Sequence, residues 1–247
     1  MLTRVLSVGL LAGFLAGLLI AILQQVTTTP LILVAETYEK QSEAAPANPT
    51  ASRADKGHDH AAHDHAAHDH AWKPADGLPR FFYTSVATIA TAVGISFLLI
   101  AGMIFAGDTI DERRSLAWAI AGFVASGLAP AAGLAPELPG SAAGDLVARQ
   151  IWWFGTAVAT GLALWAFLRM ENPIARLGAF VLLLAPHLIG APHPHEFESK
   201  VPAEIAAQFA ALSLVVQGLM WAFAGIAVGL LWPKFATQPA GRRPVPS

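Results

Sequence analysis

The residues of this chain best suited to chemistry are the histidines of a repeated stretch, HDHAAHDHAAHDH, at positions 58–70. Neutral imidazole binds borderline divalent ions such as Co²⁺, Ni²⁺, Zn²⁺ and Cu²⁺. No apolar residue larger than alanine occurs in the stretch, so we expect it to be disordered. Metal capture with little geometric selectivity is predicted for His58, His60, His63, His65, His68 and His70. The alternative is a soluble spacer whose histidines arose by repeat slippage.

A second group of histidines lies in LLLAPHLIGAPHPHEFESKVPAE, at positions 182–204. The metal-ligand candidates here are His187, His193, His195 and Glu196. His187 falls in or at the end of an apolar segment, where an ionisable side chain is a functional candidate by default. The prolines and the glycine around it are expected to interrupt the helix and free backbone carbonyls, as at transporter ion sites. The alternatives are a His187 ring bonded to a neighbouring helix and ordinary loop histidines.

A third candidate is Glu137, in the apolar, proline-rich turn GLAPAAGLAPELPG. A carboxylate in such a turn is either a metal ligand or the ion-pair partner of a base such as Arg149. The sequence contains no cysteine, so thiolate metal sites and thiolate catalysis are excluded. Any metal is then held by imidazole, carboxylate, amide or backbone oxygen.

The composition predicts that a membrane positions these residues. Hydrophobic residues make up 55% of the 247 and charged residues 13%, far from the roughly 25% charged residues of an ordinary soluble domain. The fold class expected is an all-α integral membrane protein with about six transmembrane helices. The apolar segments that could span the bilayer are 5–26, 81–106, 116–134, 151–170, 174–189 and 205–232. The count becomes five if Pro186 makes the fifth segment a re-entrant hairpin.

These segments divide the chain into four parts. They are a first transmembrane helix within residues 1–26, a histidine- and aspartate-rich extracytoplasmic loop at 27–80, a bundle of about five further helices at 81–232, and a polar tail at 233–247. The first segment is longer than a signal-peptide core, so we expect an anchor. Glycines recur every fourth residue in it, at Gly9, Gly13 and Gly17, and the last segment carries Gly225 and Gly229. Such stripes are expected to let helices pack closely.

The charges predict the orientation of the chain. If six segments span, one side carries mostly basic residues, which are Arg4, Arg113, Arg114, Arg169, Arg176, Lys234, Arg242 and Arg243. The acids on that side are fewer: Asp108, Asp111, Glu112 and Glu171. The positive-inside rule places this side in the cytoplasm. Both termini are then cytoplasmic, and the histidine tract and the segment around His193 face the same outer compartment.

Several strings of the sequence resemble the CbtA family of proposed cobalt transporter subunits. They are TPLILVAETYE, the His/Asp tract followed by WKPADG, GLAPAAGLAPELPG, RQIWWFGTA and APHLIGAPHPHE, and they run in order along the chain. The resemblance implies a multi-pass protein of the bacterial inner membrane with cobalt as the transported ion. It also implies a small, single-span, CbtB-like partner. Nickel or zinc is the alternative cargo, because the residues do not distinguish these ions from Co²⁺.

The mechanism we expect is a relay without an ATPase of its own, since the sequence contains no G-x-x-x-x-G-K-[ST] string. A divalent cation moving inward gains about 4.6 kcal/mol at 100 mV, which is enough for uptake. The tract collects the ion, the loop residues pass it on, and His187 with Glu137 forms the narrower site. The main alternative is a metal-binding scaffold or sensor that serves a partner transporter. Catalysis is not expected, because HPHE lacks the tight spacing of H-E-x-x-H, and no nucleic-acid partner is expected.

Overall fold

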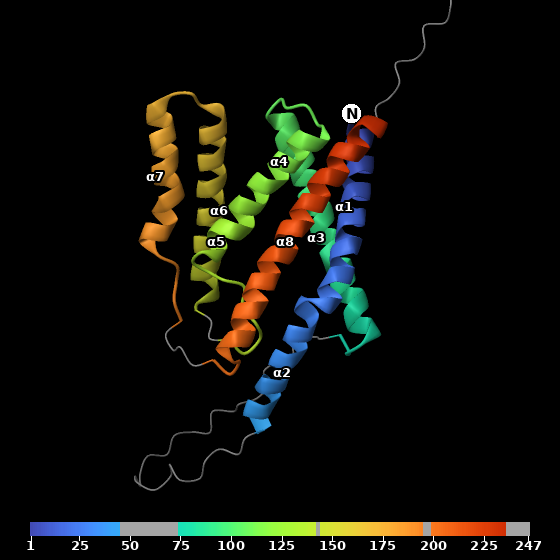
Figure 1. The fold of residues 1–247 in the computed structure, drawn as a ribbon, viewed down its shortest axis with the longest axis vertical. Coiled ribbons are helices and arrows are strands. Elements are labelled where there is room, and N and C mark those ends of the chain that lie inside the picture. The colour runs from blue at the N-terminus through green and yellow to red at the C-terminus, as the bar shows by residue number, and fades with distance from the viewer. Residues whose placement is uncertain (45–73, 142–143, 195–198, 236–247) are drawn as a thin grey trace, which may run out of the picture.

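The computed structural model describes residues 1–44, 74–141, 144–194 and 199–235, and every regular element in these ranges is helical (Figure 1). The elements are α1 (Leu2–Val26), α2 (Thr28–Ala44), α3 (Leu78–Phe105), α4 (Glu112–Phe123), the π-helix η2 (Val124–Leu128), α5 (Ala129–Ala131), α6 (Leu146–Arg169), α7 (Pro173–Ile189), α8 (Ala203–Leu231) and the 3-10 turn η3 (Trp232–Phe235). The predicted all-α class is confirmed for this part of the chain. The tract at 58–70, His195 and Glu196 lie outside the described residues.

The long helices run up and down between two ends of the molecule (Figure 1). One end, here called the amino-terminal end, carries Met1, residues 106–111, residues 170–172 and the end of α8. The other, the loop end, carries residues 132–145 and 190–194. The helices that flank the histidine-containing segment, α2 before it and α3 after it, have their adjoining ends at the loop end as well. The histidine-containing segment and residues 190–194 therefore leave the bundle at the same end, as the expected relay requires.

Four of the described helices are long and apolar enough to cross a membrane. They are α1, α3, α6 and the stretch Ala203–Phe235, which joins α8 to η3. The helix α7 is apolar but shorter, and α4, η2 and α5 follow one another without a break at the place of the third expected span. Length and composition thus support four spans, and the six-span arrangement remains a proposal.

The glycine stripes mark the closest helix contacts, as the sequence predicted. A Cβ added to Gly13 would lie 2.3 Å from the Cα of Val93, so α1 and α3 touch backbone to backbone. On α8, a Cβ at Gly229 would lie 2.5 Å from the Cα of Glu112 on α4. Small residues allow such approach where lipid offers no hydrophobic drive for helices to associate. The stripes are therefore packing surfaces.

The helix α2 departs from the expected loop at 27–80. The sequence predicts an extracytoplasmic loop for residues 27–80, with no helix for the apolar string TPLILVAETYE within it. Ala35 of this string is fully buried against Leu138 and Val201, with Ile32 packed beside them. Partners far along the sequence thus stabilise a helix whose own composition is only half apolar.

The helix α7 also differs from the expectation, because it continues through Pro186 to Ile189. A proline removes one backbone donor, and here the rest of the turn stays helical. The helix ends instead at Gly190, whose φ of 88° is unfavourable for residues with a Cβ. Residues 190–194 have no regular structure, in agreement with the prediction for this stretch.

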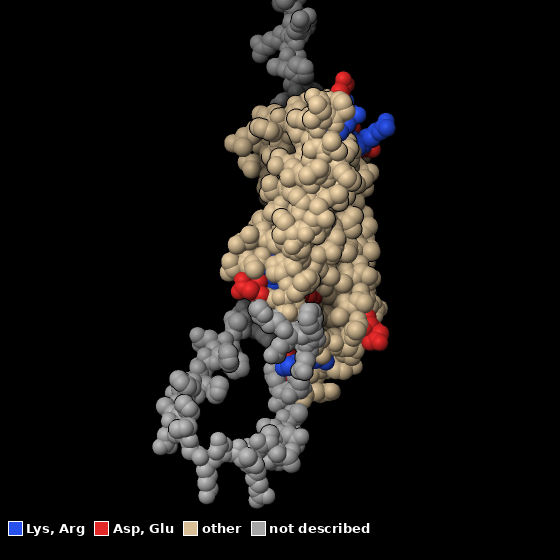
Figure 2. Space-filling view, turned by 90° about the vertical axis from the view of Figure 1, so that its left-hand side faces the viewer, with Lys and Arg blue, Asp and Glu red and all other residues tan. Residues whose placement is uncertain are grey.

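Charged side chains gather at the two ends of the molecule. On the face drawn in Figure 2, the band between the ends carries no Lys, Arg, Asp or Glu. The helix α7 lies on this side of the molecule, and large apolar side chains such as Leu177, Phe180 and Val181 are exposed along it. A charge-free band flanked by polar ends is what a bilayer requires of a spanning protein.

Candidate functional site

A cavity of about 330 Å³ opens between η2, α5, α6 and α8 and the turn that precedes α6. Its lining consists of Ser126, Gly127, Ala131, Leu134, Ala135, Pro136, Glu137, Leu146, Arg149, Gln150, Trp153, Phe154, Leu214 and Gln217. The polar members are one carboxylate, one guanidinium, two amides and one hydroxyl. The carboxylate, amide and hydroxyl oxygens could replace part of the water shell of a divalent cation.

The cavity extends from the loop end toward the middle of the bundle. Glu137 and Arg149 lie at the loop end, since Glu137 precedes α6 and Arg149 is in its first turn. Gln217 lies midway along α8, which runs from Ala203 to Leu231. A polar group at that depth is costly beside lipid and is typically found facing a bundle interior or a cavity. The polar lining therefore forms a path from one face to mid-helix.

The inner wall of the cavity is the π-helix η2. Pro130 follows it and has no N–H to donate to the carbonyl of Ser126, four residues earlier. The Ser126 hydroxyl donates to the carbonyl of Gly122 at 2.8 Å. Gly127 lets the neighbouring helix come close, because a Cβ there would lie 2.8 Å from the Gln217 side-chain oxygen. Single π-turns inside helices are frequent at functional sites.

Glu137 is paired with Arg149, the second of the two roles that the sequence left open for it. An Arg149 Nη donates to a Glu137 carboxylate oxygen at 2.6 Å. Both side chains are mostly buried, with 23% of Arg149 and 31% of Glu137 exposed. Any cation that binds Glu137 must therefore compete with Arg149 for the carboxylate.

His187 and His193 lie toward the loop end, where the cavity opens, but neither residue lines the cavity. The His187 ring packs edge-on against Trp152, with 5.9 Å between ring centroids, and the Trp152 indole N–H donates to the carbonyl of Pro186 at 3.2 Å. His193 is exposed, and its carbonyl lies beside Gly144. Within the described ranges, no three His, Asp or Glu side chains come close enough together to hold one metal ion. The pairing of His187 with Glu137 stays a prediction.

Two lining residues, Ser126 and Gln217, were not singled out by the sequence reading. Gln217 carried a signal that could have been used, because it is an amide in a long apolar segment. Ser126 carried none, since serine is common in transmembrane helices. Arg149 was recognised only as a possible partner of Glu137.

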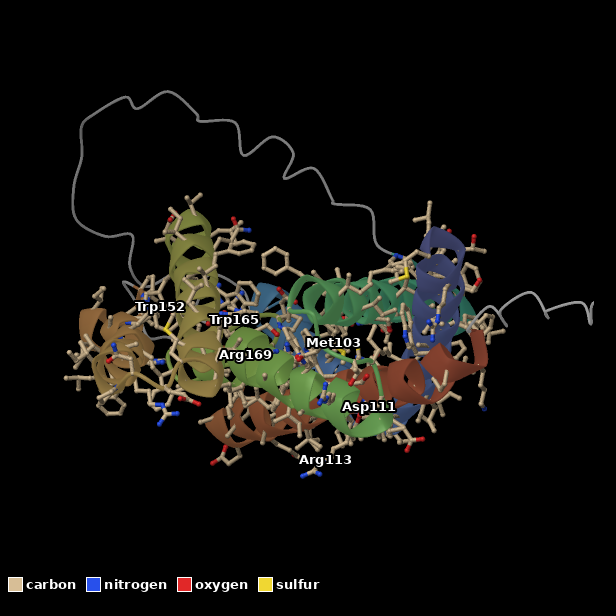
Figure 3. The ribbon with its side chains drawn as sticks, turned by 90° about the horizontal axis from the view of Figure 1, so that it is seen from above. Met103, Asp111, Arg113, Trp152, Trp165 and Arg169 are labelled. Carbon is tan, nitrogen blue, oxygen red and sulfur yellow. The ribbon has the colours of Figure 1, made fainter. Side chains whose placement is uncertain are left out.

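A second cavity, of about 400 Å³, lies toward the amino-terminal end. Its walls are mainly apolar, and its carboxylate, Asp108, is already occupied by the Trp118 indole N–H at 2.8 Å and by Arg169. Trp165 and Arg169 extend from α6 toward α4 in this region (Figure 3). Both cavities hold a carboxylate paired with arginine, but only the polar cavity adds amide and hydroxyl oxygens for a cation, so it is the better candidate.

The loop end holds another ion pair that is built differently. Arg80 bonds Glu36 through both of its terminal nitrogens, at 3.0 and 2.5 Å, and also reaches Asp76 at 3.2 Å. The hydrogen bond from Arg80 holds the pKa of Glu36 below its usual value. This two-pronged contact joins α2 to the start of α3 and serves the fold.

Comparison with known families places the chain clearly. Residues 2–233 match a family model described as "Probable cobalt transporter subunit (CbtA)". Among curated proteins and among solved structures, no match was found. The family match spans the helices α1 to α8 and the residues that line both cavities.

Proposed function

The chain belongs to the CbtA family, and on that premise we propose that it is the membrane subunit of a divalent transition-metal uptake system with Co²⁺ as its cargo. The observation that carries the proposal is the polar cavity, which leads from the loop end to Gln217 at mid-helix. A cation that enters this cavity can reach the middle of the bundle beside polar side chains, without contact with lipid. Nickel and zinc ions remain alternative cargoes.

The proposed route begins at the histidine tract, His58 to His70, which captures the ion. His193, His195 and Glu196 pass it on, and His187 with Glu137 forms the narrower site. Support comes from the arrangement of the described segments, because the end of α2, the start of α3 and residues 132–145 and 190–194 all lie at the loop end (Figure 1). Imidazole binds these metals only when it is neutral, so we expect uptake to decline as the pH falls toward 6.

The loop end faces the outside in this proposal, and the amino-terminal end faces the cytoplasm of a bacterial inner membrane. The described bases Arg4, Arg113, Arg114, Arg169, Arg176 and Lys234 at the amino-terminal end support this orientation through the positive-inside rule. All six expected segments would then span, with α7 and the α4–α5 stretch as the short ones. A single-span CbtB-like protein, implied by the family resemblance, is the proposed partner.

Uptake of Co²⁺ into cells that express the full chain and its partner tests the proposal. We expect deletion of residues 58–70 to reduce uptake mainly at low metal concentration, because the tract concentrates the ion. His187→Ala and Glu137→Gln should reduce uptake at every concentration. Wild-type activity at all concentrations in both point variants would show that the roles are wrongly assigned.

A second preparation, purified protein in vesicles, separates transport from a scaffold or sensor role. Purified protein in vesicles that binds Co²⁺ at the surface but leaves the lumen free of metal would support the scaffold. Competition among Co²⁺, Ni²⁺ and Zn²⁺ during uptake identifies the cargo. We expect excess Ni²⁺ or Zn²⁺ to inhibit the uptake of Co²⁺ less than excess Co²⁺ inhibits the uptake of either of them.

A further inference from the structure

We propose that the Glu137–Arg149 pair is an exchangeable closure over an oxygen-donor cation site inside the polar cavity. A divalent cation arriving from the loop end takes the Glu137 carboxylate from Arg149. Three neutral oxygens of the lining then share the ion with Glu137, those of Ser126, Gln150 and Gln217. This inference rests on the proposed function and adds to it a binding site and a built-in competitor.

The first support is the geometry of the ion pair. Only one contact joins Arg149 to Glu137, and the Arg149 Nε is buried without a hydrogen-bond partner. By contrast, Arg80 holds Glu36 with two parallel bonds at the same end of the molecule. A two-pronged guanidinium–carboxylate contact is the stronger and more specific form. The Glu137–Arg149 pair has one hydrogen bond and an unsatisfied Nε–H. It should therefore exchange more readily than the Glu36–Arg80 pair.

The second support is the position of the pair. Glu137 and Arg149 lie at the outer part of the cavity, and the deeper lining offers only neutral oxygens and apolar groups. With Arg149 in place, the fixed charges of the cavity cancel, and a cation gains little by entering. Once Glu137 turns to the metal, the oxygens of Gln150 and Gln217 can replace water molecules lost from the ion.

Exchange of this kind explains how the site could bind and still release its ion. Conduction requires binding that is favourable enough for entry and weak enough for departure. Arg149 remains tethered next to Glu137, so it competes at a high local concentration and recovers the carboxylate as the ion moves on. Removing Arg149 should therefore tighten binding and slow turnover.

The test is Co²⁺ uptake into vesicles that contain the purified full-length protein and a metal-sensitive dye. Arg149→Gln is expected to lower the half-saturating Co²⁺ concentration by about tenfold or more and to reduce the maximal rate. The matched control is Arg80→Gln, which removes the same group from the two-pronged pair and should leave half-saturation unchanged. An unchanged or higher half-saturation in Arg149→Gln overturns the proposal.

A second measurement uses the wild-type protein and needs neither transport nor a stable variant. Phenylglyoxal modifies free guanidinium groups, and mass spectrometry locates the adduct. Co²⁺ should increase the modification rate of Arg149 several-fold and leave that of Arg80 unchanged. If Co²⁺ fails to increase the reactivity of Arg149, the exchange does not occur.

The two measurements keep the proposals apart. Vesicles that take up no Co²⁺, although the metal exposes Arg149, would refute transport by this chain and support the site. Uptake with normal saturation in Arg149→Gln and no metal-dependent reactivity would leave the proposed function intact and refute the exchange.

Discussion

At the scale of single residues, the most informative side chain is Gln217. It lies midway along an apolar helix, where an amide is costly beside lipid, and it lines a cavity in contact with the π-helix. Gly127 leaves room for it, since a Cβ there would lie 2.8 Å from the Gln217 side-chain oxygen and that side chain would have to shift. An amide held this way is placed to contact a solute inside the bundle.

We expect Gln217→Leu to raise the half-saturating Co²⁺ concentration by up to about tenfold, because losing one polar contact costs about 0.5–1.5 kcal/mol of binding. Gln208→Leu is the matched control, since Gln208 is exposed on the same helix and does not line the cavity. Uptake is measured in vesicles over a range of metal concentrations. Equal shifts in the two variants would mean that the effect comes from the helix and not from the cavity.

Among the elements, α1 and α3 form the closest contact, and its cause is the glycine stripe. Gly13→Ala places a methyl group 2.3 Å from the Cα of Val93, where only a backbone shift can relieve the clash. Overpacking of this kind costs about 1–3 kcal/mol, so we expect a lower melting temperature in detergent.

Gly94→Ala provides the control for this change. Gly94 lies on α3 itself, and a Cβ there would meet nothing within 4 Å. Its melting temperature should equal that of the wild type or exceed it slightly, because alanine favours helix. If the two variants melt at the same temperature, the close contact of α1 with α3 does not limit stability.

The attachment of α2 to the bundle should depend on pH through Glu36. The pKa of Glu36 lies below its usual value of 4.5 because Arg80 bonds the carboxylate. The ion pair therefore stabilises the docked helix above pH 4.5, and this contribution is lost as the pH falls through the lowered pKa.

A nitroxide at Lys40→Cys on the exposed face of α2 can follow this loss. Its mobility in the electron paramagnetic resonance spectrum should rise as the pH is lowered from 5 to 3. In a Glu36→Gln background the spectrum should no longer change over this range. A pH-dependent rise that persists in Glu36→Gln would point to another carboxylate.

For the whole molecule, the decisive property is which end faces outward and whether α7 crosses the membrane. The sequence contains no cysteine, so single-cysteine variants can be labelled with a membrane-impermeant maleimide on intact cells. We expect Asp76→Cys and His193→Cys, at the loop end, to be labelled. Glu171→Cys, before α7 at the amino-terminal end, should be protected until the cells are opened.

The pair that flanks α7 makes this a test of the span count. Glu171 and His193 on opposite faces would support six spans, whereas equal labelling of both would make α7 a re-entrant element. Protection of Asp76 and His193 with labelling of Glu171 would reverse the orientation. The uptake route from the histidine tract would then have to be abandoned.

Much about this protein follows from its sequence by itself. Long apolar segments predict membrane helices because unpaired backbone groups are too costly in lipid, and glycines at every fourth residue predict close helix contacts because they form one face. The family is also legible in the strings around Glu137, Arg149 and His187, and the match over residues 2–233 confirms it.

Other properties depend on contacts between residues far apart in the chain, and only the tertiary structure decided them. Whether Glu137 meets Arg149, and whether Gln217 shares a cavity with both, depends on how each helix is rotated about its axis, which apolar segments leave nearly undetermined. The helix α2 packs against Leu138 and Val201, and the residues of α2 by themselves do not predict this contact. Local pattern thus specifies which segments become membrane helices, and packing specifies which of their polar groups meet.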